Sequence, residues 1–261
     1  MTAPESSTPP TLLLSQRDAY LRACEATVLA VDPATREVAL DQSVFYPGGG
    51  GQPCDTGVLR TDAGSEWPVT AVRKAGPTAW HALGGDGPLP AVGQAVTGEI
   101  DWGQRYRLMR THTALHVLCG VVFRDYGALV TGGNMGVDGA RMDFEMDSAD
   151  FTPARVAEIA ARANAEIAAG HPTRVRFLPR EEAFRIPDLI RTKTNLLPEG
   201  IAEVRIVEIV GLDLQADGGT HVAGTREVGG LRVVGTRSKG KANKRLEIVL
   251  VDDAVAGDAA S

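Results

Sequence analysis

Residues 107–123, RLMRTHTALHVLCGVVF, mark the place where the chain changes from short strand-like runs to longer elements. Apolar residues recur there at helical spacing, which predicts an amphipathic helix. Its inward face is expected to consist of Leu108, Leu115, Leu118, Cys119 and Val122. Residues four apart on a helix lie one turn above each other, so His112 and His116 are expected to point the same way.

The part of the chain before this helix has the pattern of a small β-rich lobe. Short β-type runs separated by turn residues are typical of a small barrel or sandwich, and we expect a β-barrel. The runs are residues 27–31, 37–40, 57–60, 68–74, 80–83 and 95–100. The stretch FYPGGGGQP, residues 45–53, interrupts them with four consecutive glycines. These glycines permit positive φ or the close approach of another backbone, and a flexible loop is the simpler alternative.

After residue 123 the pattern mixes helices and strands, so we predict an α+β fold. Thr152 before Pro153 marks the start of a long helix, and Gly170 marks its end. The other expected elements are a glycine-rich turn at 131–139, strands at 143–145, 173–178 and 202–210, a short helix at 180–184 and a hairpin at 231–251. Two domains are therefore expected, a barrel lobe at 1–103 and an α+β domain at 104–261.

A second motif, residues 217–221 with the sequence DGGTH, supplies another imidazole and a carboxylate. We predict that His112, His116, Asp217 and His221 bind one metal ion, and nitrogen with carboxylate ligands suits Zn²⁺. Asp217 either coordinates the ion directly or orients a ligating imidazole. The helix lacks the glutamate of an HExxH motif, so the general base of zinc proteases is absent.

The two glycines of this motif have a physical explanation. Gly218 and Gly219 allow a turn sharp enough for Asp217 and His221 to face one point, or let a substrate approach the backbone. The remaining histidines, His81 and His171, are far from both motifs in the sequence and are assigned no role.

The formal net charge is -6, so binding of nucleic acid would depend on local basic patches. One patch precedes the histidine motif and contains Arg105, Arg107 and Arg110. The other contains Arg237, Lys239, Lys241, Lys244 and Arg245. The alternative interpretation of the second patch is a solvated hairpin tip.

Targeting signals and disulfides are not expected. Residues 1–10 are polar and rich in proline and serine, which is typical of a disordered start and not of a secretory signal. No apolar run is long enough for a membrane helix, so a cytoplasmic protein is expected. The three cysteines are odd in number and far apart, and we expect them to be buried without forming a disulfide.

The chain resembles the AlaX family, the free-standing trans-editing relatives of the editing domain of alanyl-tRNA synthetase. The resemblance covers roughly residues 25–250 and is specific as a combination. It rests on FYPGGGGQ at 45–52, DTG at 55–57, the HxxxH of His112 and His116, RTKTNLLP at 191–198 and GGTH at 218–221. With both lobes present, the chain looks like the medium-length type.

This resemblance implies a C-terminal domain of the threonyl/alanyl-tRNA synthetase second-additional-domain type. It implies hydrolysis of alanine tRNA mischarged with serine or glycine, at one zinc ion bound by the HxxxH pair and a later Cys-x-x-x-His pair. The cysteine position of that pair is Asp217 here, a harder ligand than thiolate.

Several residue roles follow from the resemblance and from the patches. His112, His116 and His221 are the expected catalytic residues. The expected substrate-binding residues are Thr131, Gly218, Gly219 and Thr220. The expected tRNA-binding residues are Gly49, Gly50, Gly51, Gln52, Lys239, Lys241, Lys244 and Arg245. No membrane and no obligatory protein partner is expected.

Two other functions fit the same residues. One is a zinc-stabilised tRNA-binding protein without catalytic activity, because the altered ligand set could have cost it activity. The other is a metal-dependent hydrolase of another small ester or amide. A complete synthetase is disfavoured, because the length leaves no room for an aminoacylation domain beside two lobes.

Overall fold

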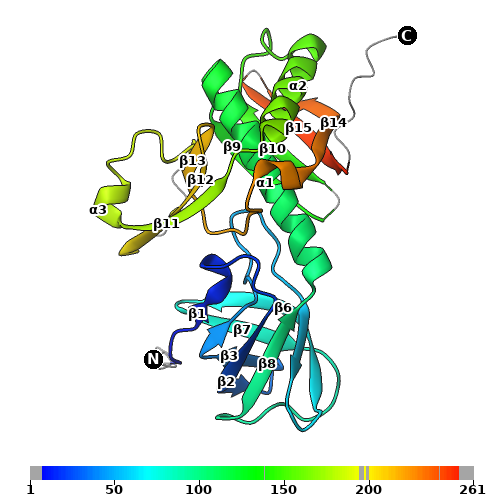
Figure 1. Cartoon of the computed structure of the whole chain (residues 1–261), viewed down its shortest axis with the longest axis vertical. Coiled ribbons are helices and arrows are strands. Elements are labelled where there is room, and N and C mark those ends of the chain that lie inside the picture. Colours follow the sequence, from blue (N-terminus) through cyan, green and yellow to red (C-terminus); the bar gives the residue numbers. More distant parts are fainter. Residues whose placement is uncertain (1–7, 138, 194–196, 198–199, 241, 253–261) are drawn as a thin grey trace. The chain divides into compact units, whose positions relative to one another are not determined.

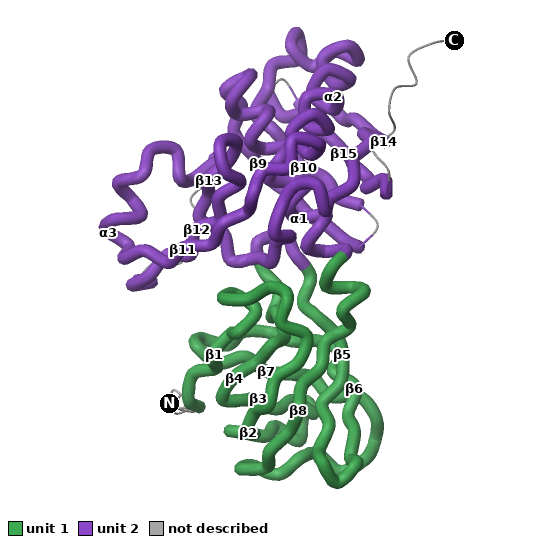
Figure 2. Tube along the Cα trace, viewed as in Figure 1, with its two compact units in different colours: residues 1–49, 53–106 green, residues 50–52, 107–261 purple. Residues whose placement is uncertain are grey.

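The computed structural model describes residues 8–137, 139–193, 197, 200–240 and 242–252. The chain forms two compact units, residues 1–49 with 53–106 and residues 50–52 with 107–261 (Figure 2). The division after Tyr106 lies close to the expected boundary at residue 103. Residues 50–52 differ from the expectation, because they belong to the second unit although the first contains both flanking segments. Residues 1–7 of the expected disordered start, residues 1–10, lie outside the described residues.

The first unit is a closed six-stranded barrel, as predicted, with strand order β2-β3-β7-β6-β5-β8 (Figure 1). Neighbouring strands are antiparallel throughout. Its strands are β2 Ala23–Asp32, β3 Glu37–Leu40, β5 Gly57–Arg60, β6 Glu66–Ala75, β7 Thr78–Leu83 and β8 Ala95–Ile100. Two short strands, β1 Leu12–Leu13 and β4 Gln42–Ser43, pair beside the barrel, and a 3-10 turn, η1 Leu14–Gln16, follows β1.

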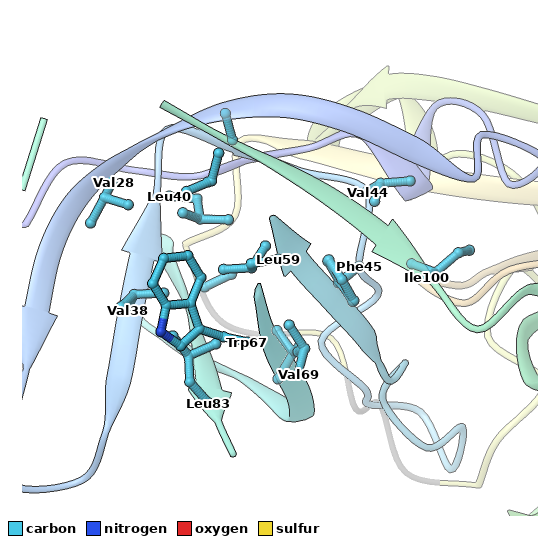
Figure 3. Packing of buried hydrophobic residues seen from close by; sticks show 14 residues of the cluster. Val28, Val38, Leu40, Val44, Phe45, Leu59, Trp67, Val69, Leu83 and Ile100 are labelled. Carbon is cyan, nitrogen blue, oxygen red and sulfur yellow. The ribbon is translucent and has the colours of Figure 1, made fainter. Parts of the chain in front are cut away.

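Alternating side chains from the barrel strands fill its interior, as the period of a strand requires. Figure 3 shows the labelled core residues Val28, Val38, Leu40, Val44, Phe45, Leu59, Trp67, Val69, Leu83 and Ile100. Phe45, at the start of the glycine motif, is completely buried in this core. The first residue of the motif is therefore held by packing inside the barrel. Close packing also explains Gly57, because a Cβ there would lie 2.1 Å from the carbonyl oxygen of Glu99.

Arg105 corrects one of the predicted basic patches. Its side chain is completely buried in the first unit and pairs with the buried carboxylate of Asp55. The guanidinium also donates to the carbonyl oxygens of Ala19 and Val44, at 3.0 and 2.8 Å. Arg105 is therefore a structural residue, since a buried charge is stable only when paired and hydrogen-bonded.

Helix α1 Trp102–Tyr126 extends beyond the predicted helix at both ends. The second unit is built around its part from residue 107 onward, and residues 102–106 belong to the first unit. Every residue from 111 to 122 is buried, which identifies this part of α1 as a central helix. The predicted inward face is confirmed, and the opposite face is covered as well. The two histidines of α1 therefore lie inside the unit, where only other protein groups or a bound species can satisfy them.

A four-stranded antiparallel sheet, order β14-β15-β10-β9, forms one part of this unit (Figure 1). Its strands are β9 Val130–Met135, β10 Ala140–Glu145, β14 Gly230–Ser238 and β15 Asn243–Val251. Strand β9 corrects the predicted glycine-rich turn at 131–139, because pairing with β10 holds Gly132 and Gly133 extended. Helix α2 Pro153–Ala169 starts at Thr152 and ends before Gly170, as predicted, and packs on β14.

A second, three-stranded sheet has the order β11-β12-β13. Its elements are β11 Thr173–Pro179, α3 Arg180–Ala183, β12 Glu203–Ile209 and β13 Asp213–Ala216, and the turn η2 Thr225–Val228 follows them. Elements β11, α3 and β12 agree with the predicted strand at 173–178, helix at 180–184 and strand at 202–210. Strand β13 was not predicted. A tight turn connects β12 to β13, and its residue Leu212 packs against Gly120 of α1. Among the described residues, the helices are all too short or too polar to cross a lipid bilayer.

Candidate metal centre

The four residues predicted to bind a metal lie together in the second unit. His112, His116, Asp217 and His221 each offer one donor atom, and these atoms lie within 4.8 Å of one another. Three of the four are buried and Asp217 is nearly so. The imidazole centres are 4.3 to 5.1 Å apart. The convergence that the two motifs predicted is therefore present in the fold.

Each imidazole has its Nδ1 atom occupied by a protein partner. Nδ1 of His112 lies 3.0 Å from Oε1 of Gln52, and Nδ1 of His116 lies 2.9 Å from Oδ2 of Asp213. Nδ1 of His221 lies 3.3 Å from Oγ1 of Thr113. These contacts leave the three Nε2 atoms as the donors available to the cluster, which is how second partners orient metal-binding histidines.

Asp217 is held in place by the turn to which it belongs. Its Oδ2 atom accepts a hydrogen bond from the backbone N–H of Gly219 at 2.7 Å. Arg205 donates to the carbonyl oxygen of Asp217 at 2.9 Å, and its guanidinium lies 3.8 Å from the carboxylate. A Cβ on Gly219 would lie 2.3 Å from the imidazole of His112. Glycine is therefore required at this position.

Burial and charge set the protonation of these groups. Burial lowers the pKa of His112 to about 4 and, with the neighbouring histidines, lowers the pKa of His221 well below its usual range. Burial also opposes charge on His116, but the hydrogen bond and charge of Asp213 outweigh it and raise its pKa. The histidines overcome the effect of burial on Asp217 and hold its pKa well below the ordinary value. The centre thus offers imidazoles beside an ionised carboxylate.

Two donor separations lie near those expected around a tetrahedral ion, and all four donor atoms lie within 4.8 Å of one another. Ligand bonds of about 2.0–2.2 Å place the donor atoms of such an ion roughly 3.3–3.6 Å apart. Nε2 of His112 lies 3.6 Å from Oδ1 of Asp217, and Nε2 of His221 lies 3.1 Å from Oδ2 of the same carboxylate. Nitrogen donors with one carboxylate suit Zn²⁺ and its first-row neighbours more than Mg²⁺ or Ca²⁺.

Comparisons with known proteins show the family of this chain. The family model of class II (A) tRNA synthetases matches residues 20–104, and that of the threonyl and alanyl tRNA synthetase second additional domain matches residues 204–247. The alanyl-tRNA editing protein AlaX-M of Methanosarcina barkeri is 40% identical over 238 residues, which cover 90% of this chain and 97% of that protein. This chain belongs to the AlaX-M family. AlaX-M of Saccharolobus solfataricus is 38% identical over 88% of this chain and 94% of that protein.

The AlaX-M family is related to alanyl-tRNA synthetase. The alanine–tRNA ligase of Pyrobaculum calidifontis is 37% identical over 235 residues. That match covers 86% of this AlaX-M chain and 25% of the ligase. The similarity is thus confined to a quarter of the larger protein.

In this AlaX-M chain, the glycine motif contributes directly to the centre. Gln52 was expected to contact tRNA, but its side chain is buried, and it holds His112 and both the N–H and the hydroxyl of Thr220 at 2.8 to 3.0 Å. Thr220, expected to bind substrate, is equally buried in this network. A Cβ on Gly50 would lie 3.8 Å from Oδ1 of Asp217, and one on Gly51 would lie 3.6 Å from the carbonyl oxygen of Gly133.

Other predicted residues lie at the surface. Gly49 and Gly218 are exposed, and Gly49 accepts a hydrogen bond from the hydroxyl of Tyr46 at 3.0 Å. Thr131 is exposed on β9, with its Oγ1 3.2 Å from Oδ1 of Asn243. These positions leave their expected contacts with substrate or tRNA as predictions.

The predicted lysine patch is reorganised by the fold. Lys244 differs from the expectation, because its side chain is buried and its Nζ donates to Ser148, Ser238 and the carbonyl oxygen of Gly240. The alternation of β15 explains this, since Lys244 lies on the same face as the buried Leu246. Lys241 lies outside the described residues. Lys239 and Arg245 instead lie on the opposite face of the four-stranded sheet, where both contact Asp143.

Three residues at the centre were not predicted. Asp213 and Arg205 are isolated charges in strands, with no spacing that connects them to the histidines. Thr113 lies within the histidine motif, and its hydroxyl donates to Met109, contacts His221 and accepts from the N–H of Val222. A polar residue on a helix face that is otherwise apolar was the available signal for Thr113.

Proposed function

We propose that this AlaX-M family member hydrolyses the ester bond of alanine tRNA mischarged with serine or glycine. Membership of an alanyl-tRNA editing family supports an editing substrate. The observation that carries the proposal is the convergence of His112, His116, Asp217 and His221 on one point. Zn²⁺ is the proposed cofactor, since these donors suit it.

A separate hydrolase is useful because size discrimination is weak for small amino acids. One small group is worth only about 1–3 kcal/mol in a binding pocket. Serine and glycine therefore differ too little from alanine for a single site to reject them strongly. A second, hydrolytic site with its own selectivity removes the product of such an error.

A divalent ion bound at the centre would polarise either the ester carbonyl or an attacking water. The protein's own residues prepare the site for that chemistry. Gln52, Asp213 and Thr113 contact the Nδ1 atoms of the three imidazoles and so orient the rings before a substrate binds. Gly219 keeps the space beside His112 free of a side chain.

The remaining predicted contacts complete the proposal. Gly218 and Thr131 are exposed and available to the amino acid or terminal ribose, and Gly49, Gly50 and Gly51 are open to the acceptor end of tRNA. Attraction of phosphates by basic residues would supply affinity that depends on salt. The ribose hydroxyl is the leaving group of the ester hydrolysis.

The test compares two histidine variants of the second unit. We expect His116→Ala to abolish hydrolysis of seryl- and glycyl-tRNA and the binding of Zn²⁺. His171→Ala is the matched control, because His171 contacts Glu166 outside the centre, and we expect it to keep both properties. Unchanged hydrolysis by His116→Ala would exclude the proposal.

The same assay separates the two other functions. A protein that binds tRNA and Zn²⁺ but leaves every charged tRNA intact is a non-catalytic binding protein. Hydrolysis of a free amino-acid ester with no preference for the tRNA ester would identify a hydrolase of small molecules.

A further inference from the structure

One face of the four-stranded sheet carries a concentration of positive charge. Asp143 of β10 lies at its centre and accepts two hydrogen bonds from Arg245 of β15, at 2.6 and 2.9 Å. Nζ of Lys239 lies 3.1 Å from the same carboxylate, and Nη1 of Arg141 lies 3.9 Å from it. Strand pairing places Arg237 opposite Arg245 on this face. We call these residues the Asp143 face.

The charges on the Asp143 face do not cancel. Arg141, Lys239 and Arg245 lie against Asp143, and Arg237 lies one strand away. Strand alternation places two further carboxylates on this face, Glu145 on β10 and Glu247 on β15, and Glu247 is paired with Arg141. Four cations against three carboxylates leave a positive balance. The side chains of Arg141 and Lys239 are 40% and 37% exposed, so both can reach a ligand. Asp143 fixes the position of Arg245 and Lys239, which reduces the entropy lost when they bind an anion.

Strand β9 leaves the Asp143 face open on the side toward the candidate metal centre. Gly132 is paired with Asp143, and a Cβ there would lie 3.7 Å from its carboxylate. Gly133 is the next residue, and the carbonyl oxygen of Gly51 accepts a hydrogen bond from Met135 at the end of β9. The glycine segment 50–52 thus connects this strand with Asp217 and His112.

We infer that the Asp143 face binds the phosphodiester backbone of the single-stranded 3′ end of tRNA, with Arg141 and Lys239 as the phosphate contacts. Arginine and lysine carry the donors that phosphates require, and such contacts position a nucleic acid without reading its sequence. An RNA strand that crosses β9 at Gly132 and Gly133 would bring its terminal aminoacyl ester to the candidate metal centre. This inference rests on the proposed function and names the surface that the substrate occupies.

The test measures binding of an acceptor-stem RNA hairpin that ends in single-stranded CCA, by fluorescence anisotropy at several salt concentrations. The variant is Arg141→Ala with Lys239→Ala. The matched control is Arg155→Ala with Arg162→Ala, which removes two exposed cations from α2. A third variant, Arg141→Lys with Lys239→Arg, keeps the charges of the Asp143 face.

The slope of log affinity against log salt should become shallower by about 0.7–0.9 for each phosphate that the variant no longer neutralises. KM for seryl-tRNA should rise several-fold while kcat and zinc content stay unchanged. The α2 control and the charge-keeping variant should match the wild type. An unchanged slope and KM in the first variant, with an active wild type, would overturn the inference and leave the proposed function standing. A wild type that neither binds the hairpin nor hydrolyses charged tRNA would overturn both.

Discussion

Nδ1 of His116 lies 2.9 Å from Oδ2 of Asp213, so a buried carboxylate stands directly behind one imidazole of the candidate metal centre. The approach is close because Gly120, one turn further along α1, has no side chain: a Cβ there would lie 3.1 Å from Cβ of Asp213. The second oxygen of this carboxylate lies 3.6 Å from Nε of Arg191. Asp213 therefore lies between His116 and Arg191 and contacts both side chains.

Removing this carboxylate should weaken metal binding without removing a ligand. Loss of a group that orients a ligating histidine typically costs 10–100-fold in metal affinity. We expect Asp213→Ala to lower the affinity for Zn²⁺ by about that factor, and Asp213→Asn to lower it less. Competition with a chelating dye measures this, and Asp150→Ala, an exposed carboxylate, is the control. Wild-type affinity in Asp213→Ala would show that His116 is oriented by other contacts.

Gly219 should tolerate no side chain. An alanine Cβ would lie 2.3 Å from the imidazole of His112 and 2.7 Å from Oε1 of Gln52. We expect Gly219→Ala to displace His112 and reduce zinc binding at least as much as Asp213→Ala. In the control Gly224→Ala, the new Cβ lies 3.6 Å from the nearest atom, an ordinary contact, and zinc binding should be unchanged. Full zinc binding by Gly219→Ala would contradict the packing described here.

With Asp217 as a ligand, the centre should discriminate less between Zn²⁺ and harder ions than it would with a cysteine thiolate at the same position. Replacing the carboxylate by a softer ligand favours Zn²⁺ over harder ions. We expect Asp217→Cys to bind Zn²⁺ more tightly and Mn²⁺ more weakly than the wild type, and Asp217→Ala to lose affinity for both. Titration with each metal measures the ratio. The same ratio in wild type and Asp217→Cys would mean that residue 217 does not coordinate the ion.

Asp143 should make the stability of the protein depend on pH. Hydrogen bonds from Arg245, aided by Lys239, lower its pKa from 3.8 to about 2. Because the folded pKa lies below the unfolded one, this stabilisation is complete above about pH 4 and is lost as the pH falls toward 2. Each unit of pKa corresponds to about 1.4 kcal/mol, so the contribution is roughly 2–3 kcal/mol.

Urea denaturation of Asp143→Asn and wild type at a series of pH values tests this. We expect the difference in the free energy of unfolding to be largest near pH 7 and to shrink below pH 4. Asp150→Asn should show no such difference. A gap that stays constant down to pH 3 would mean that the effect is not electrostatic.

Sequence patterns predicted the parts of the fold that depend on periodicity. The barrel strands are short β-type runs separated by turn residues, and Thr152 and Gly170 mark the ends of α2, so both were found. Strand β9 was missed because Gly132 and Gly133 are typical of turns, while in the fold pairing with β10 overrides that preference. Strand β13 was missed because it is short and polar.

The sequence predicted residues of the candidate metal centre only where a recognisable motif connects them. His112 and His116 are a turn apart, and Asp217 and His221 share a motif, so their convergence could be expected. Asp213 supports His116 from another strand, and a single carboxylate has no pattern that reveals a contact so distant in sequence. Lys244 shows the opposite failure, because its charge suggested a surface, whereas the alternation of its own strand already indicated burial.

The central claim is that a metal ion held by these four residues is required for hydrolysis of mischarged alanine tRNA. The most direct measurement follows deacylation of seryl-tRNA by one preparation with known metal content, first as purified, then after chelation, and then after return of one equivalent of Zn²⁺. We expect hydrolysis to stop when the metal is removed and to recover when it is restored. Full hydrolysis by protein shown to contain no metal would contradict the account.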